Sequence, residues 1–366
     1  MRHLLGCTAI APVLAALAGT DAAAETQITS ATTAPARTST VASGSADDIT
    51  ISSAGSITLT SGAAVTVDSN NDVSNAGTIT INDADNVTGI LIAPGTSGDI
   101  TNSGSITAVD DAFFVSASTI SGGIVNTGTI TGATNAINIV NATAPITITN
   151  SGLIDGTVIL DDSILRLNGL TSRVTGAVTG GAGSTVTVNG TFTTENTFSV
   201  DNFAIGTGGR LNIGHGVTTT SGMSNAGTLA VAGGVNTTLS GNYTQTTGGD
   251  LEFSTGSGFG TLAVTGTVDL SASGLVTVNL PSLLTVGTVQ DVLTAGTLTA
   301  GTLTTTSSGH LFYSVTAVRD GNTIDLAVTR DLLLTDAVSA RSLPYASGVA
   351  GALDLLIAAG GGTGLD

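Results

Sequence analysis

One six-residue phrase recurs along this sequence, and its clearest copy is Asn126-Thr127-Gly128-Thr129-Ile130-Thr131. The phrase consists of asparagine, a small residue, glycine, a second small residue, isoleucine or leucine, and usually threonine. Further copies begin at Asn75, Asn102, Asn150 and Asn225, and a variant begins at Ser53. The starts from Ser53 to Asn150 are nearly evenly spaced, and the final gap, from Asn150 to Asn225, is close to three such periods. Repetition at this length is typical of a solenoid or a linear array.

Apolar and polar residues alternate around the phrase, as in Thr78-Ile79-Thr80-Ile81 and Ile146-Thr147-Ile148-Thr149. A period of two places every second side chain on one face of a β-strand. Asparagine and glycine accept the left-handed backbone that turns between strands use. One turn is too thin to bury its own isoleucines, so stacked turns would share a core, and asparagines at equivalent corners would form an amide ladder. The sequence therefore predicts an all-β fold, a parallel β-helix with about 22–25 residues per turn.

The composition supports a packed β-fold and excludes one class of partner. Hydrophobic residues make up 41% of the 366 residues, and charged residues only 9%, with 50 glycines. The net charge is −18, and there is no lysine, so all eight basic residues are scattered arginines. Without a basic stripe to neutralise phosphates, we expect no nucleic-acid partner.

The N-terminus has the features of a secretory signal peptide. Arg2 and His3 precede an apolar segment at 4–18, small residues at 22–24 provide a cleavage site, and Glu25 would begin the mature chain. Cys7 is the single cysteine, and it lies at the start of the apolar segment. A cysteine that receives a lipid anchor would lie at the end of that segment. We therefore predict an exported chain whose mature part depends on no disulfide bond.

Changes of rhythm divide the chain into five predicted segments. The repeats fill the third segment, the fourth has a different rhythm and a hairpin signal at Gly321-Asn322, and the fifth contains apolar residues at helical spacing over 347–359. The segments are a signal peptide at 1–24, a flexible lead-in or irregular cap at 25–46, the β-helix body at 47–240, a C-terminal β region at 241–330 and a helical linker at 331–366.

These residues resemble the passenger domain of classical autotransporters, the type V secretion family. The repeated phrase resembles passenger repeats, and Gly241-Asn242-Tyr243-Thr244-Gln245 and the segment around it resemble the closing autochaperone region. The resemblance implies a right-handed, pectin-lyase-like parallel β-helix at a Gram-negative outer surface. It also implies an outer-membrane translocator barrel, whose alternating strands do not occur before Asp366. We therefore expect a passenger whose C-terminal barrel is missing.

Some β-helices degrade polysaccharides, and two sequence features match that chemistry. Gly214-His215-Gly216 matches a short motif of pectin-degrading hydrolases, and Asp161-Asp162 could supply paired carboxylates. The pair lies more than two predicted turns before His215, and the basic Arg-Ile-Lys of those enzymes is absent. We interpret His215 as a turn residue, the aspartates as a solvated corner and His310 as a loop residue, and predict no catalytic residues.

Metal and cofactor sites are not expected either. Gly361-Gly362-Thr363-Gly364-Leu365-Asp366 fits the start of a calcium-binding nonapeptide, but such a site needs several tandem copies. Asp83 with Asp85, and Asp110 with Asp111, could gather a hard cation, although acidic turns are the commoner outcome. We predict no metal-ligating or cofactor-binding residues.

The functional hypothesis is an exported surface or secreted passenger, an adhesin with a role in virulence and without catalysis. Its partners would be glycans or proteins on host or neighbouring cells, or further copies of itself, held by flat faces lined with threonine and serine. One alternative is a secreted β-helical polysaccharide lyase or hydrolase. The other is a structural stalk that binds nothing by itself.

Overall fold

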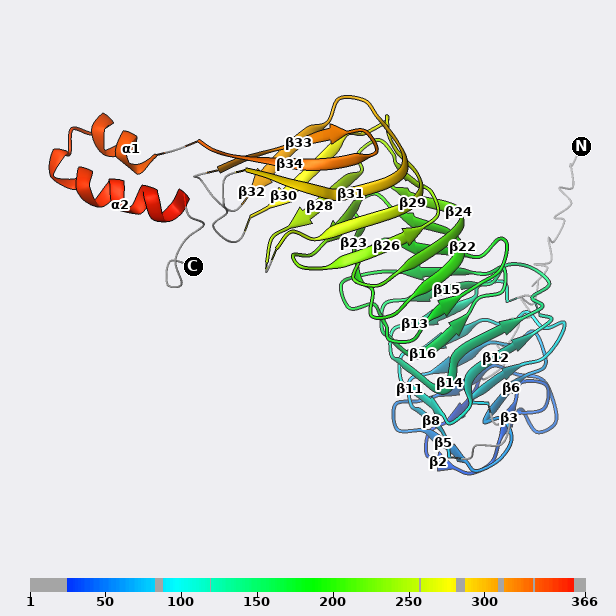
Figure 1. Cartoon of the computed structure of the whole chain (residues 1–366). Coiled ribbons are helices and arrows are strands. Elements are labelled where there is room, and N and C mark those ends of the chain that lie inside the picture. The colour runs from blue at the N-terminus through cyan, green and yellow to red at the C-terminus, as the bar shows by residue number, and fades with distance from the viewer. Residues whose placement is uncertain are drawn as a thin grey trace, which may run out of the picture.

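The structure is a computed structural model that describes residues 25–82, 88–118, 120–256, 258–280, 287–308, 313–331 and 333–358. The predicted signal peptide, Asp83, Asp85, His310 and the glycine-rich segment 361–366 lie outside these residues. The chain is all-β, with 55% strand and 6% helix, and it forms a parallel β-solenoid. Figure 1 shows an elongated body, with the first strands at one end and two short helices at the other.

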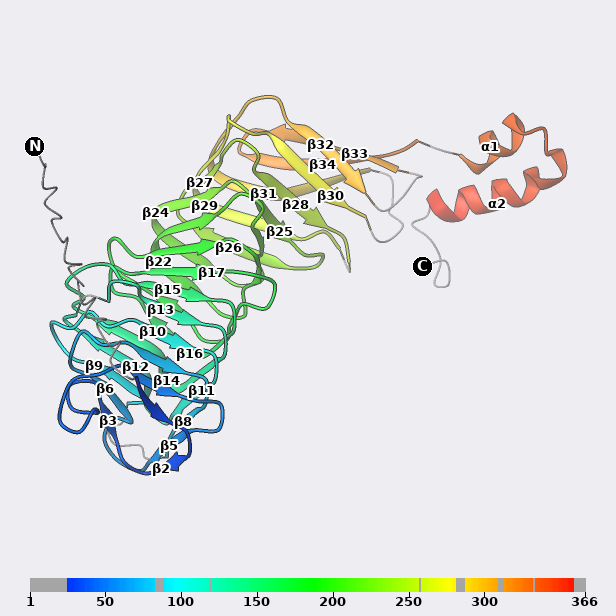
Figure 2. The same cartoon turned by 180° about the vertical axis from the view of Figure 1, so that it is seen from behind.

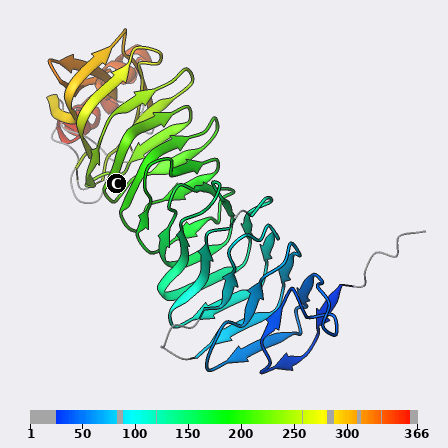
Figure 3. The same ribbon diagram turned by 90° about the vertical axis from the view of Figure 1, so that its right-hand side faces the viewer.

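Each turn of the solenoid contributes strands to three stacks, which we call columns 1, 2 and 3 in chain order. Figures 2 and 3 show how the turns follow one another along the rod. Column 1 consists of β1 (Thr26–Ile28), β4 (Ile49–Ile51), β7 (Val73–Asn75), β10 (Ile100–Asn102), β13 (Ile124–Asn126), β15 (Thr147–Asn150), β17 (Ile164–Leu167), β20 (Thr185–Val188), β27 (Tyr243–Gln245) and the second halves of β22 (Phe198–Ile205), β24 (Val217–Asn225), β29 (Thr261–Leu270) and β31 (Gly287–Ala300).

Column 2 begins with β2 (Ala31–Thr32), β5 (Ser56–Leu59), β8 (Thr78–Ile81), β11 (Ser105–Ala108), the first parts of β14 (Thr129–Val140) and β16 (Leu153–Ile159), and β18 (Arg173–Val174). In the later turns a separate parallel sheet takes the same place in the chain order. Its strands are β21 (Thr191–Thr193), β23 (Arg210–Asn212), β25 (Thr228–Val231), β28 (Asp250–Ser254), β30 (Leu275–Asn279) and β32 (Thr304–Ser308).

Column 3 consists of β3 (Ala36–Arg37), β6 (Val65–Val67), β9 (Ile90–Ile92), β12 (Asp111–Ser116), the second parts of β14 and β16, β19 (Val178–Thr179), β26 (Asn236–Ser240), and the first parts of β22, β24, β29 and β31. At the C-terminal end, β33 (Tyr313–Asp320) and β34 (Thr323–Arg330) form an antiparallel hairpin, and β34 also pairs antiparallel with β31. The hairpin predicted at Gly321-Asn322 is thereby confirmed.

The predicted turn length holds for the first part of the rod and is too long for its middle. Register partners in column 1 mark one residue per turn, and up to Asn150 they keep nearly the predicted spacing: Ile28, Ile51, Asn75, Asn102, Asn126 and Asn150. Beyond Asn150 the partners follow at shorter intervals, as Leu167, Val188, Ile205 and Asn225. The gap from Asn150 to Asn225 therefore holds four turns, where the sequence suggested about three, because the connections between columns 3 and 1 become shorter.

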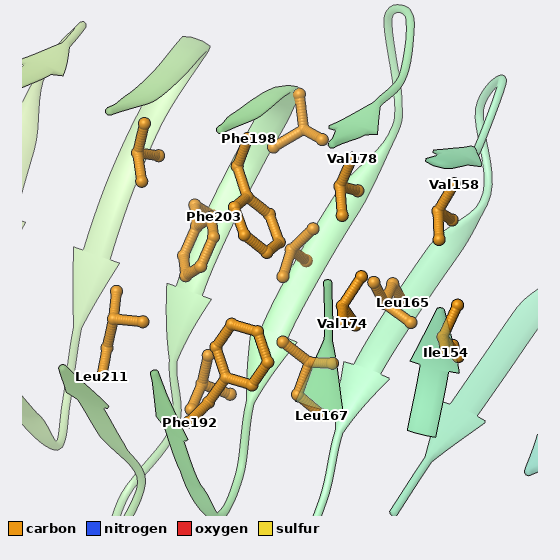
Figure 4. Close-up of a cluster of buried hydrophobic side chains, with 14 of the residues drawn as sticks. Ile154, Val158, Leu165, Leu167, Val174, Val178, Phe192, Phe198, Phe203 and Leu211 are labelled. Atoms are coloured by element: carbon orange, nitrogen blue, oxygen red, sulfur yellow. The ribbon is translucent and has the colours of Figure 1, made fainter. Parts of the chain in front are cut away.

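The inward positions of all three columns form one continuous apolar core. The isoleucines of the repeated phrase, such as Ile79, Ile106 and Ile130, are fully buried. In the middle of the rod, phenylalanines replace isoleucines, and Phe198 packs edge-to-face against Phe192 and Phe203 with ring centroids 5.8 and 5.7 Å apart (Figure 4). Such pairs add to the burial of the rings, so the aromatic residues strengthen the shorter turns.

The glycine of the phrase is required by close contact between turns. A Cβ atom on Gly128 would lie 2.1 Å from the carbonyl oxygen of Gly104, and one on Gly104 would lie 2.1 Å from that of Gly77. These glycines are not among the residues with positive φ. The sequence interpretation, which assigned them a left-handed backbone, was therefore wrong about the cause.

The structure gives a form to the two segments that flank the repeat body. Residues 25–46 were predicted as a flexible lead-in or irregular cap, but β1, β2 and β3 pair in parallel register with β4, β5 and β6. This segment thus begins the solenoid, because its few alternating residues match the turn above. In the segment 241–330 the parallel ladder continues through β32 before the antiparallel hairpin ends it.

The C-terminal helices are α1 (Leu334–Ala340) and α2 (Ser347–Ala358), joined through a 3₁₀ turn, η1 (Pro344–Ala346). The predicted helix at 347–359 corresponds to α2, but the apolar residues at helical spacing do not form its buried face, because Val349 is 65% exposed while Asp354 is buried. Asp354 faces α1, where its carboxylate accepts hydrogen bonds from the N–H groups of Leu334 and Thr335. Ser347 begins α2, and its hydroxyl donates to the carbonyl of Pro344. Within the described residues, no helix has the length and apolar character that crossing a membrane requires.

Candidate functional site

The structure does not bring the residues of the polysaccharide-degrading hypothesis together. The register partners Val158, Val178, Phe198 and Val217 are successive positions in column 3. Asp161 follows the first of these strands, and His215 precedes the last. The two residues therefore lie three turns apart, at opposite ends of the column 3 strands, and form no acid–base pair.

The neighbours of His215 are residues that the sequence did not single out. Its Nδ1 lies 2.7 Å from the carbonyl oxygen of Thr194, and its backbone N–H donates to the hydroxyl of the same residue. Glu195 lies close by and receives two hydrogen bonds from Arg173, at 2.5 and 2.7 Å. These hydrogen bonds, with smaller effects from the charges of Arg173 and His215, lower the pKa of Glu195. Glu195 is thus held as an anion, which suits a surface ion pair rather than a proton donor.

Two of the aspartates considered from the sequence have hydrogen-bond partners of their own: Asp111, proposed as a metal ligand, and Asp161, proposed as an acidic residue of a polysaccharide-degrading site. Asp111 is buried, and its two carboxylate oxygens accept hydrogen bonds from the side-chain amides of Asn135 and Asn138 at 2.7 and 2.8 Å. Asp161 accepts a hydrogen bond from the backbone N–H of Ala142 at 3.1 Å. In the described part of the chain, no three histidine, cysteine or acidic residues lie together in a way that could hold a metal ion.

The asparagines of the repeated phrase form the predicted amide ladder. The side-chain N–H of Asn75 donates to the amide oxygen of Asn102, Asn102 donates to Asn126, and Asn126 donates to Asn150, at 2.8, 2.8 and 2.7 Å. Asn150 continues the series to the hydroxyl of Ser172 at 3.0 Å. The four asparagines are buried, so the ladder satisfies polar groups inside the rod and offers nothing to a ligand.

In the later turns a different chain of hydrogen bonds replaces the ladder. Asn225 donates to the phenol oxygen of Tyr243 at 2.9 Å, and this phenol donates to the side-chain oxygen of Gln245 at 2.8 Å. Gln245 then donates to the carbonyl of Leu275. Burial raises the pKa of Tyr243, which therefore stays protonated and serves as a structural donor.

A charged network on the outer side of β23, β25 and β28 was not predicted. Arg210 makes two hydrogen bonds to Glu252, at 2.8 and 2.6 Å, and donates to the side chain of Asn212 at 3.0 Å. The pair crosses β25 at Ala230, whose small side chain is buried. Burial raises the pKa of the neighbouring Asp250. No sequence signal marks this pair, because its members lie 42 residues apart in turns of unequal length.

One surface that remains open to a partner is the outer side of column 2 in the early turns. We call it the hydroxyl face. It consists of the outward residues of β5, β8, β11 and the first part of β14, and all eight are serine or threonine: Ser56, Thr58, Thr78, Thr80, Ser105, Thr107, Thr129 and Thr131.

Register pairing arranges the hydroxyl face as two straight rows. One row runs from Ser56 to Thr129 and the other from Thr58 to Thr131, with neighbouring turns about 4.8 Å apart. All eight side chains are exposed or half-buried. Among the residues that the structure describes, their hydroxyl groups take part in no hydrogen bond. These hydroxyls are therefore free to bind water or another molecule.

The charges of the early turns lie away from this face. The described acidic residues between positions 26 and 150 lie in column 3 or on the connections at its two ends: Asp47, Asp48, Asp68, Asp72, Asp99, Asp110 and Asp111. Arg37, the basic residue of this part, lies in β3 and pairs with Asp68 at 3.0 Å. The outer sides of columns 1 and 2 are therefore uncharged in these turns, and the next strand of column 2, β16, carries Asp155 in register with Thr131.

Comparison of the chain with protein-family models, with curated proteins and with solved structures gives no match in any of the three. The fold defines the chain as a parallel β-solenoid. Its resemblance to autotransporter passengers rests on the residues quoted above.

Proposed function

We propose that this chain is the exported passenger of an autotransporter-type protein, displayed at or released from a bacterial surface, and that it acts there in adhesion or self-association. The signal-peptide features at 1–24, the cysteine-free body and the repeated phrase support export and a passenger role. A rod of stacked turns can carry a long, regular surface away from a cell, which suits contact with other surfaces.

The hydroxyl face is the observation that carries the proposal. Its free hydroxyl groups occur once per strand row on each successive turn of the solenoid. A binding partner can therefore make the same weak hydrogen-bond contact many times along one line. Enzymes concentrate their polar groups in a pocket with altered pKa values, whereas these groups form a flat, uncharged surface. The polysaccharide-degrading alternative gains no support from His215 and Asp161, which lie three turns apart.

The test displays the chain on non-adherent bacteria, fused to a heterologous outer-membrane anchor. Cells that carry it should clump or adhere to other cells more than cells that carry the anchor alone. Mass spectrometry of the exported product should show Glu25 as its first residue. Equal clumping and adherence with and without the chain would refute the function, and a product that retains residues 1–24 would refute the export route.

A further inference from the structure

We propose that the hydroxyl face is the contact through which two copies of this rod pack against each other. This inference rests on the proposed role in self-association and names the surface and the partner. The outer sides of β5, β8, β11 and the first part of β14 carry serine and threonine at every outward position, with hydroxyls that the fold leaves unused.

A second copy fits this face because the face is complementary to itself. Two identical rods related by a twofold axis must present the same patch to each other. A hydroxyl group both donates and accepts hydrogen bonds, so a row of hydroxyls can pair with an identical row. The repeat also matches, because both copies have the same spacing of about 4.8 Å between turns. If one rod slides along the other by one turn, so that Thr107 takes the place of Thr80, most of the hydroxyl pairs between the two rods can still form.

Electrostatics favours this face over column 3 and its connections in the early turns. The chain carries a net charge of −18, so two copies repel each other wherever their acidic residues meet. Between positions 26 and 150 the described acidic residues belong to column 3 and its connections. Contact through the hydroxyl face keeps these aspartates out of the paired rows, and Asp155, in register with Thr131 on the next turn, lies at the edge of the face. Added salt should therefore strengthen the association, because it screens the remaining repulsion without weakening the hydroxyl contacts.

The size of the face predicts weak pairing that becomes strong through repetition. Four turns at about 4.8 Å and strands of four residues at about 3.3 Å give roughly 250 Å² per copy. This is well below the roughly 800 Å² per partner of a standard stable interface. A single pair of rods should dissociate readily, whereas many rods on one surface should hold together by avidity.

The experiment uses beads that carry the purified chain, attached at its C-terminus at a series of surface densities. We compare the wild type with the double variant Thr80→Asp/Thr107→Asp, which places two carboxylates at the centre of the face. The matched control, Thr218→Asp/Thr220→Asp, adds the same charge at exposed threonines of β24 in or beside column 3. A third variant, Thr80→Ser/Thr107→Ser, keeps the hydroxyls. Circular dichroism and thermal melting establish that each variant is folded.

The wild type, the control and the serine variant should aggregate at similar densities, and the Thr80→Asp/Thr107→Asp beads should need about tenfold higher density or fail to aggregate. Aggregation of this variant at the wild-type density would overturn the inference and leave self-association through another face. No aggregation of wild-type beads at any density would overturn both this inference and the self-association role. Loss of binding to a glycan array in the aspartate variant, with bead aggregation unchanged, would assign the face to a glycan and also overturn the inference.

Discussion

Replacement of Asn126 by aspartate tests the buried amide ladder with almost no change of shape. The side-chain N–H group of Asn126 donates to the amide oxygen of Asn150 at 2.7 Å and to the carbonyl of Leu153 at 3.1 Å. Its own oxygen accepts from Asn102 at 2.8 Å. An ionised aspartate keeps the acceptor but has no donor, so two buried oxygens lose their partner and face a negative charge.

The loss of stability caused by Asn126→Asp depends on pH. It grows as pH rises, whereas most acidic residues of a folded protein stabilise it more as pH rises. At low pH the protonated acid can still donate to Asn150. The Leu153 carbonyl then loses a donor, at a cost of about 1–3 kcal/mol, while the Gly128 carbonyl loses a weaker contact at 3.4 Å and keeps the N–H group of Leu153. Burial among acceptors raises the pKa of the introduced carboxyl above its unfolded value of about 3.9, so the variant becomes less stable as pH rises from about 4. If the folded pKa exceeds 7, ionisation adds about 4 kcal/mol at pH 7.

The assay is denaturant unfolding of the Asn126→Asp variant and the wild type from pH 3 to pH 7, followed by circular dichroism. Hydrogen exchange at the neighbouring amides detects local opening, because a solenoid need not unfold in one step. The matched control is Asn189→Asp, in which an exposed asparagine donates to Asn168 at 3.0 Å, and it should change stability by less than about 1 kcal/mol. Equal effects of the two substitutions, or an Asn126→Asp effect that does not grow with pH, would refute the ladder's role.

Three further substitutions test other parts of the rod. Gly128→Ala should destabilise it by about 3 kcal/mol or more, because the new Cβ lies 2.1 Å from a carbonyl oxygen, whereas Gly348→Ala, with open space around it, should not lower the melting temperature. Arg210→Ala should lower the free energy of unfolding by about 1–2 kcal/mol in denaturant unfolding, because it leaves the buried Glu252 without its arginine partner. Arg37→Ala should lower it by less than about 1 kcal/mol, because the pair with Asp68 is more exposed. Asp354→Asn should raise hydrogen exchange in α1 about tenfold or more, because a charge-assisted hydrogen bond contributes about 1.5–3 kcal/mol.

The Asp354 effect should also follow a predictable pH dependence. Burial opposes ionisation of Asp354, but the N–H groups of Thr335 and Leu334, the Thr335 hydroxyl and the charge of Arg330 outweigh it and lower its pKa. The stabilisation is therefore complete above the unfolded pKa of about 3.9 and is lost as pH falls through the lower folded value. The difference in exchange between wild type and Asp354→Asn should vanish at low pH. A difference that persists there would show that the carboxylate charge is not its source.

The repeated phrase predicted the features of the fold that depend on local periodicity. Alternation around Ile79 and Ile130 placed these side chains in a shared core, and equal spacing of Asn102, Asn126 and Asn150 placed their amides in one ladder. Both outcomes follow from a strand period of two and from turns of nearly constant length.

Features that depend on unequal turns or on contacts between distant segments were not predictable in this way. The pairing of Arg210 with Glu252 depends on the length of two intermediate turns, which no local pattern fixes. The buried side of α2 is set by Asp354, which caps the first turn of α1, and this tertiary contact overrides the apolar periodicity. Residues 25–46 carry too few alternating residues to reveal their pairing with the next turn.

The register of column 2 is the central claim, because the hydroxyl face exists only if Thr80 and Thr107 are neighbours on adjacent turns. In a Cys7→Ser background, Thr80→Cys/Thr107→Cys places two thiols on strands about 4.8 Å apart, within the Cα range of about 4.4–6.8 Å for disulfides. Under mild oxidation, mass spectrometry should find a disulfide within one chain. The control Thr80→Cys/Ala108→Cys, which puts the thiols on opposite faces of the sheet, should remain reduced. A reduced first pair, or equal oxidation of both pairs, would contradict the register and the face built on it.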